Sequence, residues 1–471
     1  MNDEYYDSEE FRDILAEYEA AISSGQPVFM DADDLSEIAD FYQLNNRPKD
    51  AEKAIRLALS LSPGGIAPLT YRIHEAIFEG DTDKAWEYLD QIVEKDAPDY
   101  IYDRGEILLA EGRIDEANAY FEESLATVPP EELQDYLIDV ANIMSDYDHS
   151  DLAFAWMKKT KQEDTDDYKE LMARTLSGVG KYKDSERLWG ELIDSNPFSK
   201  HYWNQLASTQ FMNEDYSAAV QSIEYAIAID PEDPDSMIAK SSGLYQLGNY
   251  EEALKYYRRY TEKVPDDEYA YLHQGACLVN LERYDEAIEV LQRGLEVAPE
   301  DSTYRADLYQ ELAFAYSEKG LVDKALDCLD KTEALTSDPV HLLVVRGHIL
   351  LAAEHFKEAE KFFRRAVLES KTPQQTLMQV IVSLYDNHFI EASYKMFKRY
   401  FKMVDEDNTE GYAYMALCCH DLKLGDEFMH YLETACKVNP RECRIALAHL
   451  FPADVEPQDY YKYVREVRGE R

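Results

Sequence analysis

Apolar side chains in this chain recur in short amphipathic stretches that end at glycine or proline. In residues 234–267, a first stretch with Leu244 and Leu247 at helical spacing ends at Gly248, which allows a left-handed turn. A second stretch follows and ends at Pro265, because proline cannot continue a helix. The apolar residues of that second stretch are Ala253, Leu254, Tyr257 and Tyr260. The pattern therefore predicts a hairpin of two helices.

The hairpin pattern recurs every 34 residues through the middle of the chain. The prolines that end the second helices are Pro197, Pro231, Pro265 and Pro299. The tyrosines that begin these helices are Tyr182, Tyr216, Tyr250 and Tyr284. The small residues expected where paired helices approach are Ser185, Ala219, Ala253 and Ala287. A strict period of this length indicates a solenoid of stacked hairpins, which offers an extended surface to a partner and favours binding over catalysis.

The hairpin resembles the tetratricopeptide repeat. Residues 200–233 match that family's pattern at seven positions: Trp203, Leu206, Ala207, Tyr216, Ala219, Ala226 and Pro231. Residues 268–301 also match it but carry Glu282 in place of the turn glycine. The template fits about twelve units and nearly the whole chain, with the best matches in the middle. The resemblance implies an all-α, right-handed superhelical solenoid of stacked antiparallel helix pairs.

We expect capping helices at both ends, because a terminal hairpin would otherwise expose its stacking face. A short insertion interrupts the repeat register and is expected to be a flexible joint. The predicted divisions are an N-terminal capping helix at 1–31, a repeat array at 32–301, the insertion at 302–305, a continued array at 306–440 and C-terminal capping helices at 441–471.

The net charge of −47 comes from 95 acidic and 48 basic residues, and it is uneven along the chain. Residues 1–150 carry 37 acidic and 10 basic side chains, whereas residues 351–400 carry 6 acidic and 8 basic ones. Such a field repels nucleic-acid backbones and anionic membranes, so we expect neither as a partner, while it speeds association with basic partners. Alternatively, the charge only keeps the outer face of a long solenoid soluble.

The chain ends and the cysteines predict a cytoplasmic protein. The chain begins with acidic residues in place of the basic and apolar segments of a signal peptide, and no apolar run is long enough to cross a bilayer. The cysteines lie inside helical patterns, as expected of reduced thiols: Cys277, Cys328, Cys418, Cys419, Cys436 and Cys443.

One cluster combines residue types that bind metals: Cys418, Cys419, His420, Cys436 and Cys443. No two of these cysteines have the two-residue gap of a zinc site, so thiols packed between helices explain them better. The sequence also contains no phosphate-cradling glycine loop and no nucleophile elbow. We therefore predict no catalytic residue, no metal and no cofactor, and we do not expect an enzyme.

In the family that the chain resembles, the inner positions of each first helix line a concave groove. The corresponding residues here are the candidate groove contacts: His201, Asn204, Ser208, Phe211, Ile238, Ser242, Tyr245, Tyr269, Leu272, Gln310, Phe314, Val344, His348 and Leu351. This mixture of rings, aliphatic groups and neutral hydrogen-bonding groups suits an extended segment or a helix of a partner protein. The family's chaperone adaptors hold a terminal carboxylate with Lys and Asn, but Asn204 and Ser208 stand at those positions, so that clamp is absent.

Eight cations in two successive second helices form a candidate basic ridge: Lys357, Lys361, Arg364, Arg365, Lys395, Lys398, Arg399 and Lys402. These cations either interact favourably with the negative C-terminal ends of their own helices, or they bind an anionic surface. That surface would belong to a partner or to a second copy of the chain. We interpret the chain as a non-catalytic protein–protein interaction scaffold. A self-associating structural scaffold is the alternative, although no sequence feature by itself indicates a homo-oligomer. An enzyme or regulator with an unrecognised site is a third, remote alternative.

Overall fold

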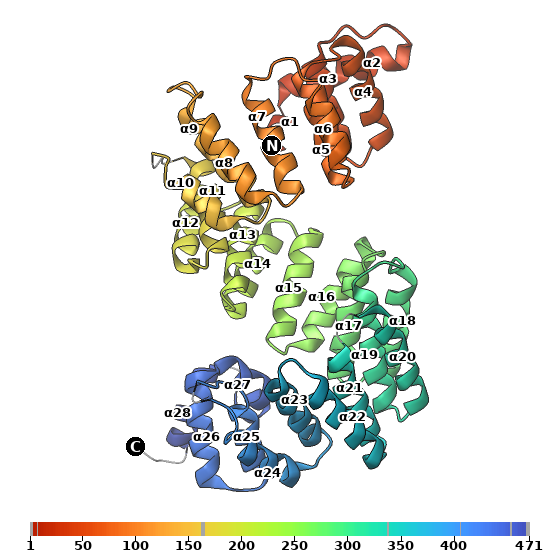
Figure 1. Ribbon diagram of the computed structural model, residues 1–471, viewed down its shortest axis with the longest axis vertical. Helices are drawn as coiled ribbons and strands as arrows, with labels where there is room; N and C mark the ends of the chain where they lie inside the picture. The colour runs from red at the N-terminus through yellow and green to blue at the C-terminus, as the bar shows by residue number, and fades with distance from the viewer. Residues whose placement is uncertain are drawn as a thin grey trace. The chain divides into compact units, whose positions relative to one another are not determined.

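The computed structural model describes residues 3–6, 8–161, 165–336, 339–405, 407–452 and 455–467. Within the two predicted caps, residues 1, 2, 7, 453, 454 and 468–471 lie outside these ranges. The described residues form α-helices joined by short turns, with no strand among them. The chain divides into two compact units, Met1–Pro231 and Glu232–Arg471 (Figure 1).

The first unit begins with two N-terminal helices, which six helix pairs follow. Its helices are α1 (Asp3–Tyr6), α2 (Glu9–Ser24), α3 (Ala32–Leu44), α4 (Pro48–Leu61), α5 (Ile66–Phe78), α6 (Thr82–Leu89), α7 (Pro98–Ala110), α8 (Ile114–Ser124), α9 (Leu133–Asp146), α10 (Ser150–Met157), α11 (Asp166–Gly178), α12 (Tyr182–Ser195), α13 (Lys200–Met212) and α14 (Tyr216–Ile229).

The second unit consists of six further helix pairs and a C-terminal segment. Its paired helices are α15 (Pro234–Gln246), α16 (Tyr250–Lys263), α17 (Glu268–Asn280), α18 (Tyr284–Val297), α19 (Tyr304–Glu318), α20 (Val322–Leu335), α21 (Pro339–Ala352), α22 (Phe356–Glu369), α23 (Pro373–Asp386), α24 (Ile390–Tyr400), α25 (Tyr412–Asp421) and α26 (Gly425–Val438). The segment after them contains α27 (Pro440–Leu447), α28 (Tyr460–Val467) and 3₁₀ turns at Ala448–Leu450 and Pro457–Asp459.

The pairs stack as a solenoid requires. Each odd-numbered helix from α3 to α25 packs against the helix that follows it, and in the first unit consecutive odd-numbered helices from α3 to α13 also touch one another. We call the odd-numbered helices the first helices of their pairs. Twelve such pairs among the described residues confirm the prediction of an all-α solenoid with about twelve units.

Small side chains allow the paired helices to approach closely. The residues predicted at these approaches are completely buried: Ser185, Ala219, Ala253 and Ala287. A glycine on the first helix meets a large side chain of its partner in the same way, and Gly105 faces the ring of Phe121. The close packing therefore depends on positions with little or no side chain.

The residue at the turn between paired helices has a positive φ in all twelve hairpins. Five of these residues are glycines, but seven carry a side chain: Asn46, Asp148, Glu214, Glu282, Glu354, His388 and Lys423. Glu282 has a φ of 58°, close to the 77° of Gly248. The missing glycine in residues 268–301 therefore changes the chemistry of the turn but not its left-handed conformation.

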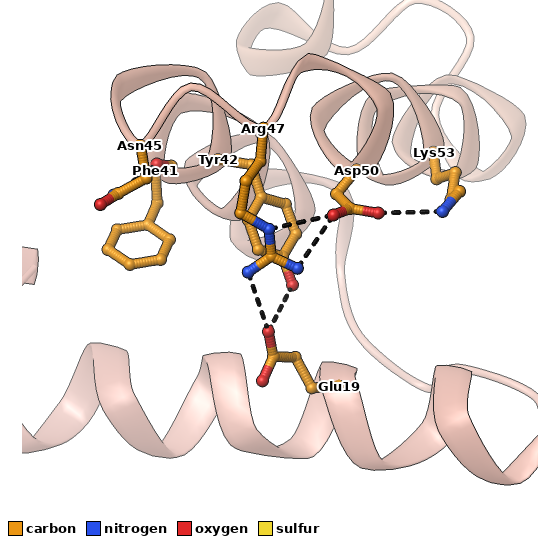
Figure 2. Close-up of polar contacts among 7 residues, drawn as sticks. All are labelled: Glu19, Phe41, Tyr42, Asn45, Arg47, Asp50 and Lys53. Carbon is orange, nitrogen blue, oxygen red and sulfur yellow. Dashed lines mark hydrogen bonds and ion pairs between the residues drawn. The ribbon is translucent and has the colours of Figure 1, made fainter.

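Helix α2 packs on the first hairpin through both apolar and polar contacts. The ring of Phe11 lies 5.1 Å from the ring of Phe41. Figure 2 shows Glu19 of α2 accepting hydrogen bonds from the hydroxyl of Tyr42 (3.0 Å) and from Nη1 of Arg47 (3.4 Å). The guanidinium of Arg47 also lies over the ring of Tyr42, 4.2 Å from its centroid. These contacts cover the outer side of the first repeat pair.

The C-terminal helices are attached to the last pair by a buried carboxylate. Oε1 of Glu442 on α27 accepts a hydrogen bond from the backbone N–H of Gly411 (2.6 Å), and Oε2 accepts one from Ala413 (2.9 Å). Both N–H groups lie at the start of α25, where a helix leaves its first donors without partners. Phe451 and Tyr460 stack beside α27, with ring centroids 3.8 Å apart.

The segment 302–305, predicted to be an insertion and a joint, lies inside the second unit. Tyr304 and Arg305 already belong to α19, and Nη1 of Arg305 donates a hydrogen bond to the carbonyl of Ala298 (2.9 Å). Ser302 donates to the carboxylate of Glu268 (2.9 Å). The flexibility of this segment stays a prediction.

Candidate functional site

Polar side chains connect consecutive first helices of the first unit. They come from α5, α7, α9, α11 and α13, and we call them the acidic row: Thr70, His74, Tyr102, Asp103, Glu106, Asp139, Asn142, Asp146, Glu170, Arg174 and His201. In a stacked array the same face of each first helix lies beside that of the next repeat. Side chains about one repeat apart in the sequence therefore meet in this row.

The step from α5 to α7 brings one imidazole against two carboxylates. Oγ1 of Thr70 donates a hydrogen bond to Oδ2 of Asp103 (2.7 Å). Nε2 of His74 lies 3.4 Å from Oδ1 of Asp103 and 3.1 Å from Oε2 of Glu106. Burial would lower the pKa of His74, but the hydrogen bonds to Asp103 and Glu106 raise it above its ordinary value of 6.5. His74 is therefore protonated at neutral pH.

Hydrogen bonds and an ion pair also connect the following first helices of the acidic row. The hydroxyl of Tyr102 donates to Oδ2 of Asp139 (2.8 Å) between α7 and α9, and burial raises the pKa of Asp139 in spite of that bond. Arg174 of α11 donates to Oδ1 of Asn142 (3.4 Å) and forms an ion pair with Asp146. The acidic row holds five carboxylates against one arginine and the protonated His74, so its net charge is negative and favours a cationic partner.

Asp40 on α3 is a further partly buried carboxylate next to this row. Burial raises the pKa of Asp40 from 3.8 to about 6, and nearby His74 only partly offsets this shift. Because the pKa in the folded state exceeds the ordinary value, the folded state binds the proton more tightly. The protonated carboxyl group makes its whole contribution to the free energy of unfolding below about pH 4. This contribution is lost as the pH rises through about 6, where Asp40 ionises in the folded state.

We therefore expect Asp40→Asn to stabilise the first unit at pH 7 but not at pH 4. The asparagine stays neutral, so it avoids the cost of a desolvated charge, which is on the order of 1–2 kcal/mol. Denaturant unfolding of the wild type and the variant at several pH values would measure the difference.

Asp50→Asn is a control of opposite sign. Hydrogen bonds from Lys53 and Arg47 lower the pKa of Asp50. Figure 2 shows these two contacts. Neutralising Asp50 removes these ion pairs and should not stabilise the protein at pH 7. A stability difference between wild type and Asp40→Asn that does not change with pH would contradict the assignment.

The first helices of the second unit carry a different set of side chains, which we call the aromatic row: Tyr245, Tyr269, His273, Tyr304, Phe314 and His348. The ring of His273 lies 5.5 Å from Tyr245 and 4.3 Å from Tyr269, and the ring of Tyr269 lies 5.6 Å from Tyr304. Burial lowers the pKa of His273 to about 4, so this imidazole is neutral. Its buried Nδ1 has no hydrogen-bond partner within the described part of the chain.

The aromatic row extends to α21 and meets polar groups there. Phe314 and His348 are in edge contact, with ring centroids 5.9 Å apart. Nδ1 of His348 lies 3.0 Å from the hydroxyl of Ser383 on α23. Burial raises the pKa of Glu311 on α19 to about 7, so this carboxyl group is partly protonated at neutral pH. The surroundings of the aromatic row on α19 therefore carry less negative charge than an ordinary glutamate would give them.

A groove of about 560 Å³ lies at the C-terminal end of the second unit, between α23, α25 and α27. Its lining residues are Tyr385, Asp386, His388, Ile390, Tyr414, Leu417, Asp421, Ile445, Ala446 and His449. Burial raises the pKa of Asp386 to about 6, and His388 lowers it in part. The mixed lining suits a side chain that is both apolar and hydrogen-bonding.

Two family models match parts of the chain. The tetratricopeptide repeat model matches residues 72–132 and 171–234. A second model, described as anaphase-promoting complex, cyclosome, subunit 3, matches residues 206–294. These ranges cover hairpins of the twelve-pair array in both units. These matches identify tetratricopeptide repeats within residues 72–132 and 171–234 of the chain.

Two solved structures similar to the chain each align with only part of it. A tetratricopeptide repeat protein from Parabacteroides merdae ATCC 43184 is 16% identical and aligns over 51% of this chain and 94% of its own, with a TM-score of 0.44. Residues 41 to the end of MamA from Desulfovibrio magneticus RS-1 are 18% identical over 37% of this chain and 97% of their own, with a TM-score of 0.35. No curated protein sequence matches the chain.

Tetratricopeptide repeats serve as protein-interaction modules, and the chain is in general terms an interaction scaffold. Two of its candidate groove contacts, His201 and Ser208, are exposed. Leu272, Val344 and Leu351 are only 7%, 6% and 7% exposed, so they pack between helices and leave little surface for a partner. The others are partly buried: Asn204, Phe211, Ile238, Ser242, Tyr245, Tyr269, Gln310, Phe314 and His348.

The structure brings some candidate groove contacts together and adds others. Phe314 meets His348, and Oγ of Ser242 lies 3.3 Å from the hydroxyl of Tyr269. Sequence reasoning missed His273, whose only signal was its place beside Leu272 on a first helix. It also missed the carboxylates of the acidic row. The family's groove positions mark contacts with a ligand, whereas these side chains meet neighbouring first helices.

Four of the eight cations in the candidate basic ridge form ion pairs, and those that form none within the described ranges are Lys357, Lys361, Arg399 and Lys402. Lys398 pairs with Glu427 of α26 at 2.6 Å, and the other three pair within their own helices. Lys398 and Arg399 lie in the last turn of α24, but no ridge cation lies in the last turn of α22. Interaction with the helix dipole therefore explains only Lys398 and Arg399.

The cysteine cluster that could have suggested a metal is a set of buried thiols. Cys418, Cys419, Cys436 and Cys443 are all buried and free of disulfide bonds. Where side chains are described, no three His, Cys, Asp or Glu residues converge as metal ligands do. None of the described helices combines the length and the apolar character that a membrane crossing needs.

Proposed function

We propose that the chain is a non-catalytic scaffold that binds an extended segment or a helix of a partner protein along the first helices of its repeats. The aromatic row is the observation that carries this proposal. Tyr245, Tyr269 and Phe314 lie on successive first helices and are only partly buried. Aromatic rings at such positions supply large contact area at low cost in conformational entropy, as binding hot spots do.

The acidic row supports a second part of the proposal, a preference for cationic segments in the first unit. Burial desolvates two of its carboxylates, Asp103 and Asp139, and desolvation strengthens the attraction of a carboxylate for a lysine or arginine of a partner. The same charge disfavours nucleic acids and anionic membranes as partners. We further propose a cytoplasmic location, because all six cysteines are buried thiols without disulfides; cell fractionation would test it.

A matched pair of double variants tests the proposal. Tyr245→Ala with Phe314→Ala removes two rings of the aromatic row, and Phe198→Ala with Phe356→Ala removes two exposed rings outside the first helices. Affinity capture from the native cell with quantitative mass spectrometry should show at least about tenfold less of the main partner on the first variant. The second variant should capture as much as the wild type.

Circular dichroism of each variant would check that the helices remain. Undiminished capture by the Tyr245→Ala, Phe314→Ala variant would show that the aromatic row is not the surface that binds the partner. Loss of capture by the Phe198→Ala, Phe356→Ala variant would instead assign the main interface to the other faces of the array.

Self-association is a second candidate, because four cations of the basic ridge form no ion pair in the described part of the protein and the first unit is strongly acidic. A contact of that kind weakens as salt rises, since the Debye length is about 8 Å at physiological ionic strength. Sedimentation velocity that finds a monomer at both low and high salt would rule it out.

A further inference from the structure

A pocket of about 780 Å³ lies between α10, α11 and α12 in the first unit, in the yellow part of Figure 1. The pocket shares α11 with the acidic row, but none of its lining residues belongs to that row. Its apolar lining consists of Phe154, Met157, Tyr168, Met172, Leu176 and Leu188. The volume is sufficient for one or two large apolar side chains.

Two lysines at this pocket share one aromatic ring. Nζ of Lys158 lies 4.0 Å from the ring centroid of Phe154, and Nζ of Lys181 lies 4.2 Å from it. Neither ammonium group has an ion-pair partner among the described residues. Two like charges on one ring repel each other, and an anion near both would relieve that repulsion.

The other cations of the pocket are already paired. Nζ of Lys169 lies 3.7 Å from Oε2 of Glu191, and Arg187 forms an ion pair with the same carboxylate. Asp184 is the second carboxylate among the described lining residues, so four cations face two anions there. In a chain with a net charge of −47, this is a local excess of positive charge around an apolar floor.

We propose that this pocket binds a segment of a partner protein in which an apolar side chain is flanked by carboxylates. The apolar side chain enters between Phe154, Met172 and Leu188, and the carboxylates meet Lys158 and Lys181. The preference is opposite to that of the acidic row, which favours cationic segments. One unit of the scaffold would thus bind two chemically different segments at separate places.

Fluorescence anisotropy with a defined probe tests this proposal on the full chain. The probe is a fluorescein-labelled peptide, Glu-Asp-Leu-Phe-Glu-Asp, which should bind with a dissociation constant in the micromolar range. Lys158→Glu combined with Lys181→Glu should weaken binding at least about tenfold, because both charges that face the carboxylates are reversed. Lys49→Glu combined with Lys183→Glu changes the net charge equally at exposed sites outside the pocket and should alter binding by less than about twofold.

Competition separates a peptide site from a general anion site. Unlabelled peptides in which alanines replace the leucine and phenylalanine, or amides replace the acids, should compete at least about tenfold less well than the parent peptide. Circular dichroism would confirm that both lysine variants keep their helices. The proposal is overturned if the probe does not bind, if binding survives the Lys158→Glu, Lys181→Glu change, or if inorganic pyrophosphate competes as well as the peptide.

Discussion

Gly105→Ala should destabilise the first unit by about 3 kcal/mol, because α7 has no room for a β-carbon at this position. A Cβ on Gly105 would lie 1.9 Å from Cζ of Phe121, whose ring is completely buried. Inside a helix, alanine is otherwise favoured over glycine by about 1 kcal/mol, so the clash has to outweigh that preference. Denaturant unfolding followed by circular dichroism would measure the change.

Gly190→Ala provides the matched control in the same unit. Gly190 lies inside α12, and a Cβ there would meet no atom within 4 Å. Alanine should therefore stabilise the protein by up to about 1 kcal/mol through helix propensity alone. Opposite signs at Gly105 and Gly190 would separate packing from propensity. If Gly105→Ala is as stable as the wild type, α7 and α8 must be able to move apart.

The second large effect is expected at the C-terminal end, where Glu442→Ala should cost about 3 kcal/mol. The carboxylate of Glu442 accepts hydrogen bonds from the N–H groups of Gly411 and Ala413, and all these groups are shielded from water. Removing the carboxylate leaves two donors without a partner and detaches α27 from α25. Unfolding experiments should show the loss, and hydrogen exchange at Gly411 and Ala413 should become faster.

Glu433→Ala is the corresponding control, because the side chain of Glu433 on α26 is 39% exposed and forms a surface ion pair with Lys437. A surface pair of this kind contributes about 0–1 kcal/mol, so the variant should be close to the wild type. Equal stability of the Glu442→Ala and Glu433→Ala proteins would mean that water replaces the buried carboxylate at the start of α25.

Much of the fold followed from the sequence because a solenoid is built from local contacts. The turn at Gly248, the small residue Ala253 and the stop at Pro265 belong to one hairpin, and each has a local physical reason. Copies of the hairpin contact mainly their neighbours, so recognising one unit predicts the stacking of all twelve. Even Glu282, which departs from the template, adopts the turn that its position in the repeat requires.

The candidate sites could not be predicted in the same way, because they depend on contacts between repeats that the 34-residue period of the sequence does not describe. The sequence placed Tyr245 and Phe314 on first helices, but only the folded chain puts the unpaired Nδ1 of His273 beside Tyr245. Leu272 fits the same positional rule and is nevertheless buried, because neighbouring helices cover it. A repeat template specifies the face of a helix, whereas the exposure of a side chain depends on the sizes of its neighbours about one repeat away.

The sequence by itself therefore determined the repeat, the hairpin, the turns and the overall acidity of this protein. Tertiary structure alone decided which charges are desolvated and which are paired. Asp40 has a raised pKa because neighbouring helices bury it, and Lys158 and Lys181 share the ring of Phe154 because α10 and α12 bring them together. Charge pairing and desolvation act over a few ångströms in space, and the spacing of residues along the chain does not encode those distances.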